Sequence, residues 1–541
     1  MPRLATISVV AAIAAMASAP AVRAQAFADA RSALVDYSKT EFLPRSACSA
    51  LVRYRRKDVV AVHAAAIPAD GSVPAYCRVT GTLAPEIAFE VSLPERWNGR
   101  FYMIGNGGLA GESLDDPLRA AQRASALRMG FAFAQTNTGH DARKEPGGTF
   151  VLSNPEKAID YAYRAVHLTA ITAKRITSRY YGRAIERSYW NSCSNGGRQG
   201  LIEAQRYPQD FDGLVVASPW IDQTGFTIGA MWNEKALSEA PPLTPSKLAL
   251  LGRKVMERCD EIDGIKDGII DDPRECDFDA RRDVPACPAG TDGDDCLSAA
   301  QAEAIMKIYS GPRGRGKALF PGYMPGSEAV VPPAFGRGTP ASAWLNFIVP
   351  SRPGAKPADF DLAENTMRYL VHVPPQPGYD YRTFDFDRDP HMLDAWGRKV
   401  NATNPDLSAF RARGGKLLMT YGWADQVLEP LEGVEYYEKA VTRNGPRTAE
   451  FFRLFMVPGM THCSGGNGTD RFDSVSAIID WVEKGKAPDS MLATHMQGDR
   501  TVRSRPLCPY PEVARYPGHG SIDDAASFSC ASAARTGRAE R

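Results

Sequence analysis

Two regions of the chain carry the hydrophobic pattern of buried strands. In each region, apolar side chains either alternate with polar ones or form short apolar runs. The predicted strands are residues 86–93, 100–104, 187–190 and 214–217 in the first region, and residues 416–421 and 452–457 in the second. Residues 157–180 place apolar side chains at helical spacing between two of these strands. Strands that alternate with helices predict an α/β fold around a parallel sheet.

The stretch between about residue 219 and residue 400 breaks this pattern. It is rich in proline and glycine, contains an acidic loop and holds four of the ten cysteines. A single hydrophobic core stops growing at roughly 250–300 residues, and this chain has 541. We therefore expect one core formed by residues 27–220 and 403–541, with residues 221–402 inserted between its halves as a cap.

The first 26 residues have the composition of a secretory signal peptide. Arg3 gives a basic start, residues 4–17 form an apolar run, and small residues follow at a cleavage site. A transmembrane anchor is the alternative, but it needs about 20 apolar residues, more than this run contains. The sequence therefore predicts no membrane span, and a protein that is secreted or periplasmic.

Cysteine content and charge narrow the chemistry further. Ten cysteines, an even number, suit disulfide bonding in an oxidising compartment. The sequence lacks the paired CxxC motifs with matched histidines that would indicate a zinc site. Lysine and arginine total 64 against 63 for aspartate and glutamate, so no excess of positive charge favours nucleic acid as a partner.

Three residues that could form a catalytic triad follow predicted strands in the order Ser, Asp, His. Ser194 stands at a predicted strand-to-helix junction just before two glycines, and Asp425 and His462 lie in loops after the two later strands. The nucleophile of an α/β-hydrolase occupies such a turn, and its partners follow in this order. Ser192 replaces the first glycine of the usual G-x-S-x-G pattern, and serine is small enough for a tight turn. A lone loop Asp or His is usually solvated or capping, but all three together favour acyl transfer.

A cysteine adjoins two of these residues, since Cys193 precedes Ser194 and Cys463 follows His462. If the triad forms, the two cysteines must lie close together. A disulfide bond between them would then fix the nucleophile relative to its base. The alternative is that Cys193 is only a small buried apolar residue.

Several stretches of the chain resemble the tannase and feruloyl esterase family. They are WNGRF (97–101), CSNGGRQ (193–199), YP (207–208), DG (212–213) and VPGMTHC (457–463). The tail RPLCPY (505–510) is also similar to that of the mono(2-hydroxyethyl) terephthalate hydrolases of this family. The resemblance covers nearly all of the mature chain. It implies a serine carboxylic ester hydrolase with an α/β-hydrolase core and a large inserted cap.

The resemblance also implies roles for other residues. The backbone N–H groups of Gly108 and Asn195 would form the oxyanion hole, and the residue after the nucleophile is the general expectation for this fold. The remaining cysteines would pair as Cys48–Cys77, Cys259–Cys276, Cys287–Cys296 and Cys508–Cys530.

The loop at residues 259–271 is acidic and offers oxygen ligands for a metal ion. Asp260, Asp263 and Asp267 supply carboxylates, and neighbouring glycines allow tight turns. The spacing is not that of an EF-hand, and the residues alone leave calcium and a solvated acidic loop both open. The family resemblance implies a structural Ca2+ held by these three side chains and by the carbonyls of Ile265 and Ile269.

The same resemblance implies a small ester of an aromatic acid as the substrate. Feruloyl esters rank first, because neither Arg352 nor Arg368 stands in the context expected of a cap arginine that holds the carboxylate of a terephthalate monoester. Galloyl esters, the substrates of tannases, and mono(2-hydroxyethyl) terephthalate are the alternatives. A hypothesis of another class is an exported protein that binds calcium or polysaccharide without catalysis. The intact order of the triad argues against it.

Overall fold

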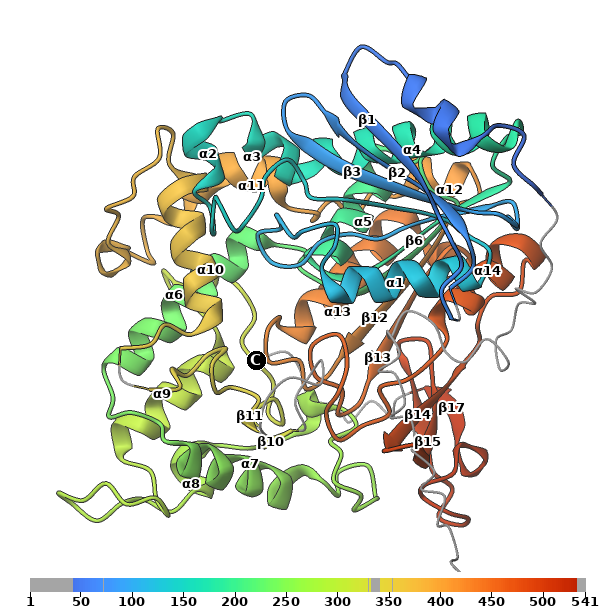
Figure 1. The fold of residues 1–541 in the computed structure, drawn as a ribbon. Helices are drawn as coiled ribbons and strands as arrows, with labels where there is room; N and C mark the ends of the chain where they lie inside the picture. The colour runs from blue at the N-terminus through green and yellow to red at the C-terminus, as the bar shows by residue number, and fades with distance from the viewer. Residues whose placement is uncertain (1–41, 72, 329, 332–340, 353, 533–541) are drawn as a thin grey trace, which may run out of the picture.

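A sheet of nine strands forms the centre of the computed structural model (Figure 1). In spatial order the strands are β1 (Val59–Ile67), β2 (Tyr76–Leu83), β3 (Ile87–Pro94), β5 (Ala132–Thr136), β4 (Arg100–Met103), β6 (Arg187–Ser194), β7 (Gly213–Pro219), β12 (Lys416–Gly422) and β13 (Phe452–Val457). The pairs from β1 to β5 are antiparallel, and those from β5 to β13 are parallel. Parallel strands direct their carboxyl ends to one edge, so the loops after β4, β6, β12 and β13 meet there.

The structure describes residues 42–71, 73–328, 330–331, 341–352 and 354–532. The predicted signal peptide, residues 1–26, lies outside these residues. Within them, no helix combines the length and the apolar composition that crossing a membrane requires.

Helices cover both faces of the sheet. They are α4 (Ala165–Tyr181), α5 (Asn195–Arg206) and α13 (Pro430–Asn444) on one face, with α1 (Pro117–Arg128) and α14 (Ser474–Lys484) on the other. Leu214 of β7 belongs to the first core and Val215 to the second, because successive strand residues point to opposite faces. A strand buried on both faces reads as a continuous apolar run, which explains the runs at residues 214–217 and 416–421.

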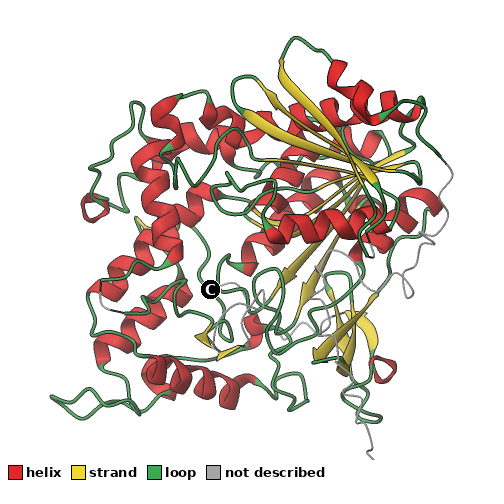
Figure 2. Cartoon of the chain, in the orientation of Figure 1, coloured by secondary structure: helices red, strands yellow, loops and turns green. Residues whose placement is uncertain are grey.

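The chain between β7 and β12 forms a cap beside the sheet (Figure 1). Its main helices are α6 (Gln223–Ser238), α7 (Pro245–Cys259), α9 (Ala299–Ser310), α10 (Ala358–Asn365) and α11 (Asp394–Val400). Helices and loops make up most of this part, with only short strands (Figure 2). Leu248, Ile305 and Trp344 lie in a hydrophobic cluster that belongs to the cap alone. The predicted α/β core with an inserted cap is therefore confirmed.

Two details of the fold differ from the pattern in the sequence. The helix predicted at residues 157–180 contains a π-helical turn, Asp160–Arg164, between a short first turn and α4. The strands β1, β2 and β5 were not predicted. Nor were the two C-terminal hairpins, formed by β14 (Met491–Gln497) with β15 (Arg500–Leu507) and by β16 (Glu512–Arg515) with β17 (Ser529–Ser532).

The ten cysteines form five disulfide bonds. The pairs are Cys48–Cys77, Cys193–Cys463, Cys259–Cys276, Cys287–Cys296 and Cys508–Cys530. Four of them link cysteines at most 29 positions apart, whereas Cys193 and Cys463 are 270 positions apart and join the two halves of the core. This long-range bond lies at the edge of the sheet where the loops meet.

Candidate active site

Ser194 occupies a strained turn between β6 and α5. Its backbone has φ 63° and ψ −128°, a conformation that side-chain-bearing residues rarely adopt and that costs on the order of 1–3 kcal/mol. A Cβ atom on Gly196 would lie 2.0 Å from Ser192 Oγ, and one on Gly197 would lie 2.8 Å from the Cα of Pro219. The turn therefore requires both glycines and accommodates Ser192. Such a turn lifts the side chain of its central residue out of the sheet edge.

Asp425 and His462 form a buried hydrogen-bonded pair. Asp425 is fully buried, and its Oδ1 accepts hydrogen bonds from the backbone N–H groups of Val427 and Leu428, each at 2.9 Å. His462 Nδ1 lies 2.9 Å from Asp425 Oδ2 and 3.1 Å from Oδ1. With Nδ1 donating to the carboxylate, Nε2 is the nitrogen that can accept a proton.

The disulfide bond connects the serine turn with the histidine loop. Cys193 and Cys463 have a Cα–Cα distance of 6.0 Å; Cys193 directly precedes Ser194, and Cys463 directly follows His462. A ring nitrogen of His462 lies within 4.8 Å of both sulfur atoms. Because the sulfur atoms are bonded to each other, they are not available as thiolate ligands for a metal. The structure thus places His462 beside the residue that precedes Ser194.

A second loop, residues 105–108 after β4, packs backbone to backbone on this turn. We call it the oxyanion loop. A Cβ atom on Gly105 would lie 2.7 Å from the Cα of Gly196, so no side chain fits between the two segments. In the described part of the chain, neither the N–H of Gly108 nor that of Asn195 donates to a protein acceptor. The side chain of Asn195 is held by Arg198 Nε at 2.7 Å. Two free N–H groups beside a nucleophile can stabilise an oxyanion.

Glu429 is a buried carboxyl four positions after Asp425 in the chain. Glu429 is 2% exposed, and burial raises the pKa of its carboxyl well above the ordinary value, with Asp359 and Asp425 raising it further. This shift favours the neutral form of the Glu429 carboxyl. On the cap side, the hydroxyl of Tyr323 donates to the carbonyl of Val427 at 3.1 Å and ties the cap to the Asp425 loop.

Two other histidines, the buried His140 and the partly buried His167, have structural contacts. His140 stacks on Phe150 at 4.2 Å, and burial lowers the pKa of its imidazole to about 4. His167 Nδ1 lies 2.6 Å from an oxygen of Asp210, and its ring stacks on Tyr207 at 3.8 Å. These contacts give His140 and His167 structural roles.

Asp260 folds the acidic loop of the cap. One of its oxygens accepts the N–H groups of Asp267, Gly268 and Ile269 at 2.9–3.2 Å. Ile265 and Ile269 are buried residues, and their carbonyls accept no hydrogen bond from the described residues. Buried carbonyls without donors, beside carboxylates, are oxygen ligands of the kind that Ca2+ takes.

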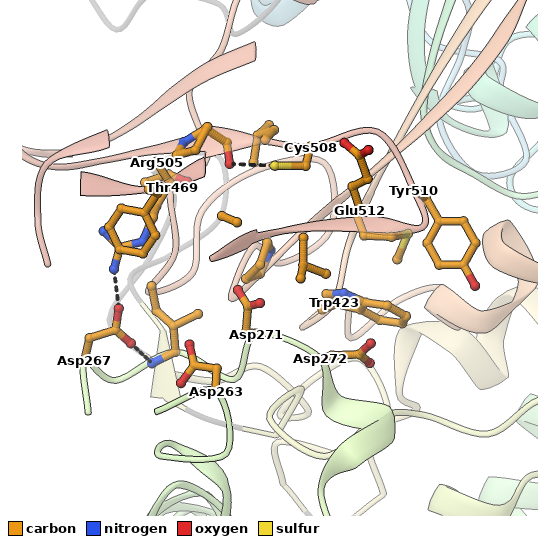
Figure 3. Close-up of a pocket in the computed structure, with 18 of the residues that line it drawn as sticks. Asp263, Asp267, Asp271, Asp272, Trp423, Thr469, Arg505, Cys508, Tyr510 and Glu512 are labelled. Carbon is orange, nitrogen blue, oxygen red and sulfur yellow. Dashed lines mark hydrogen bonds and ion pairs between the residues drawn. The ribbon is translucent and has the colours of Figure 1, made fainter. Parts of the chain in front are cut away.

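The same loop faces a pocket behind the triad loops. Asp263, Asp267, Asp271 and Trp423, which is two residues before Asp425, all line this pocket, and Figure 3 shows Asp267 pointing to Arg505. Oδ2 of Asp267 forms an ion pair with the guanidinium of Arg505 in β15 at 2.5 Å. The carboxylate oxygens of Asp260, Asp263 and Asp267 do not all lie within 4.8 Å of one another. Opposite ligands of a calcium ion can, however, be about 5 Å apart.

The chain is similar to known proteins over most of its length. The family model described as tannase and feruloyl esterase matches residues 71–531. The mono(2-hydroxyethyl) terephthalate hydrolase of Piscinibacter sakaiensis is 34% identical over 526 residues, covering 86% of this chain and 87% of that protein. A probable feruloyl esterase B-2 of Aspergillus terreus is 30% identical over 488 residues, covering 84% and 86%. The crystal structure of feruloyl esterase B from Aspergillus oryzae superimposes with a TM-score of 0.74 at 27% identity, over 90% of this chain and 100% of that one.

Two polar residues near the triad were not identified from the sequence. Gln426 accepts the backbone N–H of His462 at 3.1 Å, and Glu112 accepts the N–H of Gly107 in the oxyanion loop at 2.6 Å. Gln426 directly follows Asp425, which is the one signal that could have suggested it. Glu112 offers no comparable local signal.

We predict that replacing Cys193 and Cys463 together by alanine lowers the free energy of unfolding by about 5 kcal/mol, since the bond closes a very long loop. The rate of ester hydrolysis should fall by about 10- to 100-fold, because a shift of about 1 Å in the serine or histidine is costly. Denaturant unfolding and steady-state kinetics measure the two effects.

The matched control replaces Cys287 and Cys296, which are nine positions apart in the cap. That change should cost about 2–3 kcal/mol of stability and leave the rate unaltered. If the two double variants lose activity equally, the Cys193–Cys463 bond has no special role in the site.

Proposed function

This chain belongs to the tannase and feruloyl esterase family and is a carboxylic ester hydrolase, and we propose that it cleaves aromatic-acid esters through Ser194, His462 and Asp425. One observation carries the proposal: the buried Asp425–His462 pair is joined, through the neighbouring disulfide, to the strained turn that presents Ser194. A binding protein without catalysis would not need this arrangement.

The proposed reaction uses a covalent intermediate. Ser194 Oγ attacks the ester carbonyl carbon while His462 Nε2 takes the hydroxyl proton. The tetrahedral intermediate then breaks its bond to the alcohol oxygen, and His462 returns the proton to the leaving alcohol. Water attacks the acyl-enzyme, gives a proton to His462 and releases the acid, after which His462 reprotonates Ser194. Asp425 orients the imidazole and stabilises its charged form.

The backbone N–H groups of Gly108 and Asn195 would bind the oxygen that becomes negative in each tetrahedral intermediate. Both groups lack protein acceptors in the described residues and lie on segments in backbone contact. Arg198 is fully buried and donates to the carbonyls of Ala162 and Val400 at 2.8 Å, in addition to Asn195 Oδ1. It would therefore fix Asn195 relative to the first half of the core and to the cap helix α11.

Feruloyl esters are the substrates that we propose first. Relatives are named as probable feruloyl esterases, and a solved feruloyl esterase shares the fold over nearly all of the chain. A terephthalate monoester would need a cap cation for its carboxylate, and Arg368, one of the two arginines considered, is paired with Glu364 at 2.8 Å and donates to the Tyr379 carbonyl. Galloyl and terephthalate monoesters are the alternatives, the latter because of the 34% identical relative.

We also propose that the protein is exported and works outside the cytoplasm. The first 26 residues have the pattern of a cleaved leader. Five disulfide bonds are typical of an oxidising compartment, where they form and persist.

The acidic loop is proposed to hold one structural Ca2+. Asp260, Asp263 and Asp267 would contribute carboxylate oxygens, and Ile265 and Ile269 would contribute their unbonded carbonyls. The disulfide bond between Cys259 and Cys276 encloses this loop. The ion would stabilise the cap and take no part in acyl transfer, because the triad supplies the nucleophile and the base.

We predict that the wild-type protein hydrolyses methyl ferulate, and that Ser194→Ala lowers kcat by at least about 10⁴-fold because the nucleophile is lost. Methyl gallate and mono(2-hydroxyethyl) terephthalate are assayed alongside to rank the acyl groups. Ser188→Ala, at the other end of β6, is the matched control and should keep wild-type activity. Equal activity in Ser194→Ala, or no cleavage of all three esters by folded protein, would contradict the proposal.

For calcium, we predict one ion per chain by elemental analysis and a chelator-induced fall in thermal stability that added Ca2+ reverses. At 100 times its dissociation constant, the ion contributes about 2.7 kcal/mol. Asp263→Asn should abolish this response, whereas Asp294→Asn, in another cap loop, should preserve it. A calcium response that survives in Asp263→Asn would exclude this loop as the site.

A further inference from the structure

The first peptide group of the oxyanion loop, Gly105–Asn106, is held from two sides. The carbonyl of Gly105 accepts from the Arg119 guanidinium at 3.1 Å. The N–H of Asn106 donates to Gln199 Oε1 of α5 at 3.0 Å. This part of the loop is therefore fixed both to α1, which carries Arg119, and to the helix that begins at the nucleophile.

The next two peptide groups determine where the free N–H points. Gly107 donates its N–H to Glu112 Oε1 at 2.6 Å, and its carbonyl accepts from the N–H of Ala110 at 2.7 Å. In a planar trans peptide, the C=O and the N–H point in opposite directions. With the Gly107 carbonyl fixed towards Ala110, the N–H of Gly108 must point away from Ala110.

Glu112 binds the preceding peptide, Asn106–Gly107, and links it to the Asn106 side chain. Its second oxygen, Oε2, accepts from Asn106 Nδ2 at 2.7 Å and lies 3.3 Å from the buried guanidinium of Arg119. One carboxylate thus binds two consecutive loop residues, with its charge balanced by an arginine that holds Gly105. Hydrogen bonds to an ionised carboxylate are roughly twice as strong as those between neutral groups.

The loop needs such an external tie because it contains adjacent glycines. Gly107 and Gly108 lack side chains that could restrict them, and Gly108 has φ +44°. Leu362 of the cap helix α10 is the nearest atom group to a Cβ position on Gly108, at 3.7 Å, and it offers only an apolar contact. No other described carboxylate accepts a hydrogen bond from the oxyanion loop.

Resting on the proposed function, we propose that Glu112 is a positioning residue for acyl transfer: its carboxylate holds the Asn106–Gly107 peptide, and so fixes the adjoining Gly107–Gly108 peptide with its N–H towards the developing oxyanion. Glu112 itself does not touch the reacting atoms. Loss of one oxyanion donor costs about 10²–10³ in kcat. A donor that is present but misdirected should cost less, about 10- to 100-fold, with KM changed by less than about 3-fold because the acyl group is bound elsewhere.

The test compares three variants with the wild-type protein. Glu112→Ala removes both hydrogen bonds. Glu112→Gln keeps an amide oxygen that can accept from Gly107, but its amide nitrogen cannot accept from Asn106. Its rate should therefore lie between that of the wild-type protein and that of Glu112→Ala. Glu483→Ala is the matched control, because Glu483 is of similar exposure, pairs with Arg100 at 2.7 Å and lies on α14, away from the loop.

Two readouts separate positioning from stability. Steady-state kinetics on methyl ferulate give kcat and KM separately for each variant. Thermal unfolding shows whether each variant is folded. The second readout is labelling of Ser194 by a fluorophosphonate, followed by intact-mass and peptide mass spectrometry. In that reaction the Ser194 Oγ–P bond forms as His462 takes the hydroxyl proton, and the P–F bond breaks with loss of fluoride. The phosphoryl oxygen occupies the oxyanion position, and no ester substrate is involved.

We expect Glu112→Ala to be labelled at least about 10-fold more slowly than wild type, Glu112→Gln to be intermediate, and Glu483→Ala to be unchanged. Equal labelling of wild type and both Glu112 variants would overturn the positioning role while leaving the proposed function intact. If Glu112→Ala does not fold, an unchanged rate in Glu112→Gln overturns it equally. Wild-type protein that is not labelled at Ser194 would overturn the proposed function and this inference with it.

Discussion

The bond between Cys193 and Cys463 holds together two chain segments whose strands, β6 and β13, are not neighbours in the sheet. β6, which ends at Ser194, and β13, which precedes His462, are separated by β7 and β12. Adjacent strands lie about 4.8 Å apart, so the two strands are about 14 Å apart. A serine and a histidine that exchange a proton must come within about 3 Å. The loop after β13 therefore has to return across two strands, and the disulfide bond holds it there.

Close backbone packing supports the same loop. A Cβ atom on Gly422, at the end of β12, would lie 2.2 Å from the Met460 carbonyl, so the histidine loop rests directly on the strand that leads to Asp425. The acidic loop of the cap touches this assembly too, since a Cβ atom on Gly459 would lie 3.3 Å from the side chain of Ile269. The proposed calcium loop and the triad are thus mechanically connected through a few atoms, although they are far apart in sequence.

Much of the site could be predicted because its parts stand next to strong local signals. Ser194, Asp425 and His462 each follow an apolar run that a buried parallel strand requires, and their order restricts the chemistry. The alanine-rich β1 gave no such signal, because alanine has little preference for strands. Glu112 could not be found in this way, because the carboxylate acquires its role only when folding brings it to the peptide of Gly107.

The most direct test of the account is to trap the acyl-enzyme. The protein is mixed with methyl ferulate and quenched with acid during the first turnover. The attached acyl group is then located by proteolysis and mass spectrometry. We predict a feruloyl ester on Ser194 that forms before the acid product accumulates and is absent in the Ser194→Ala variant. An acyl group on another residue, or hydrolysis that proceeds without any acyl-enzyme, would contradict the account.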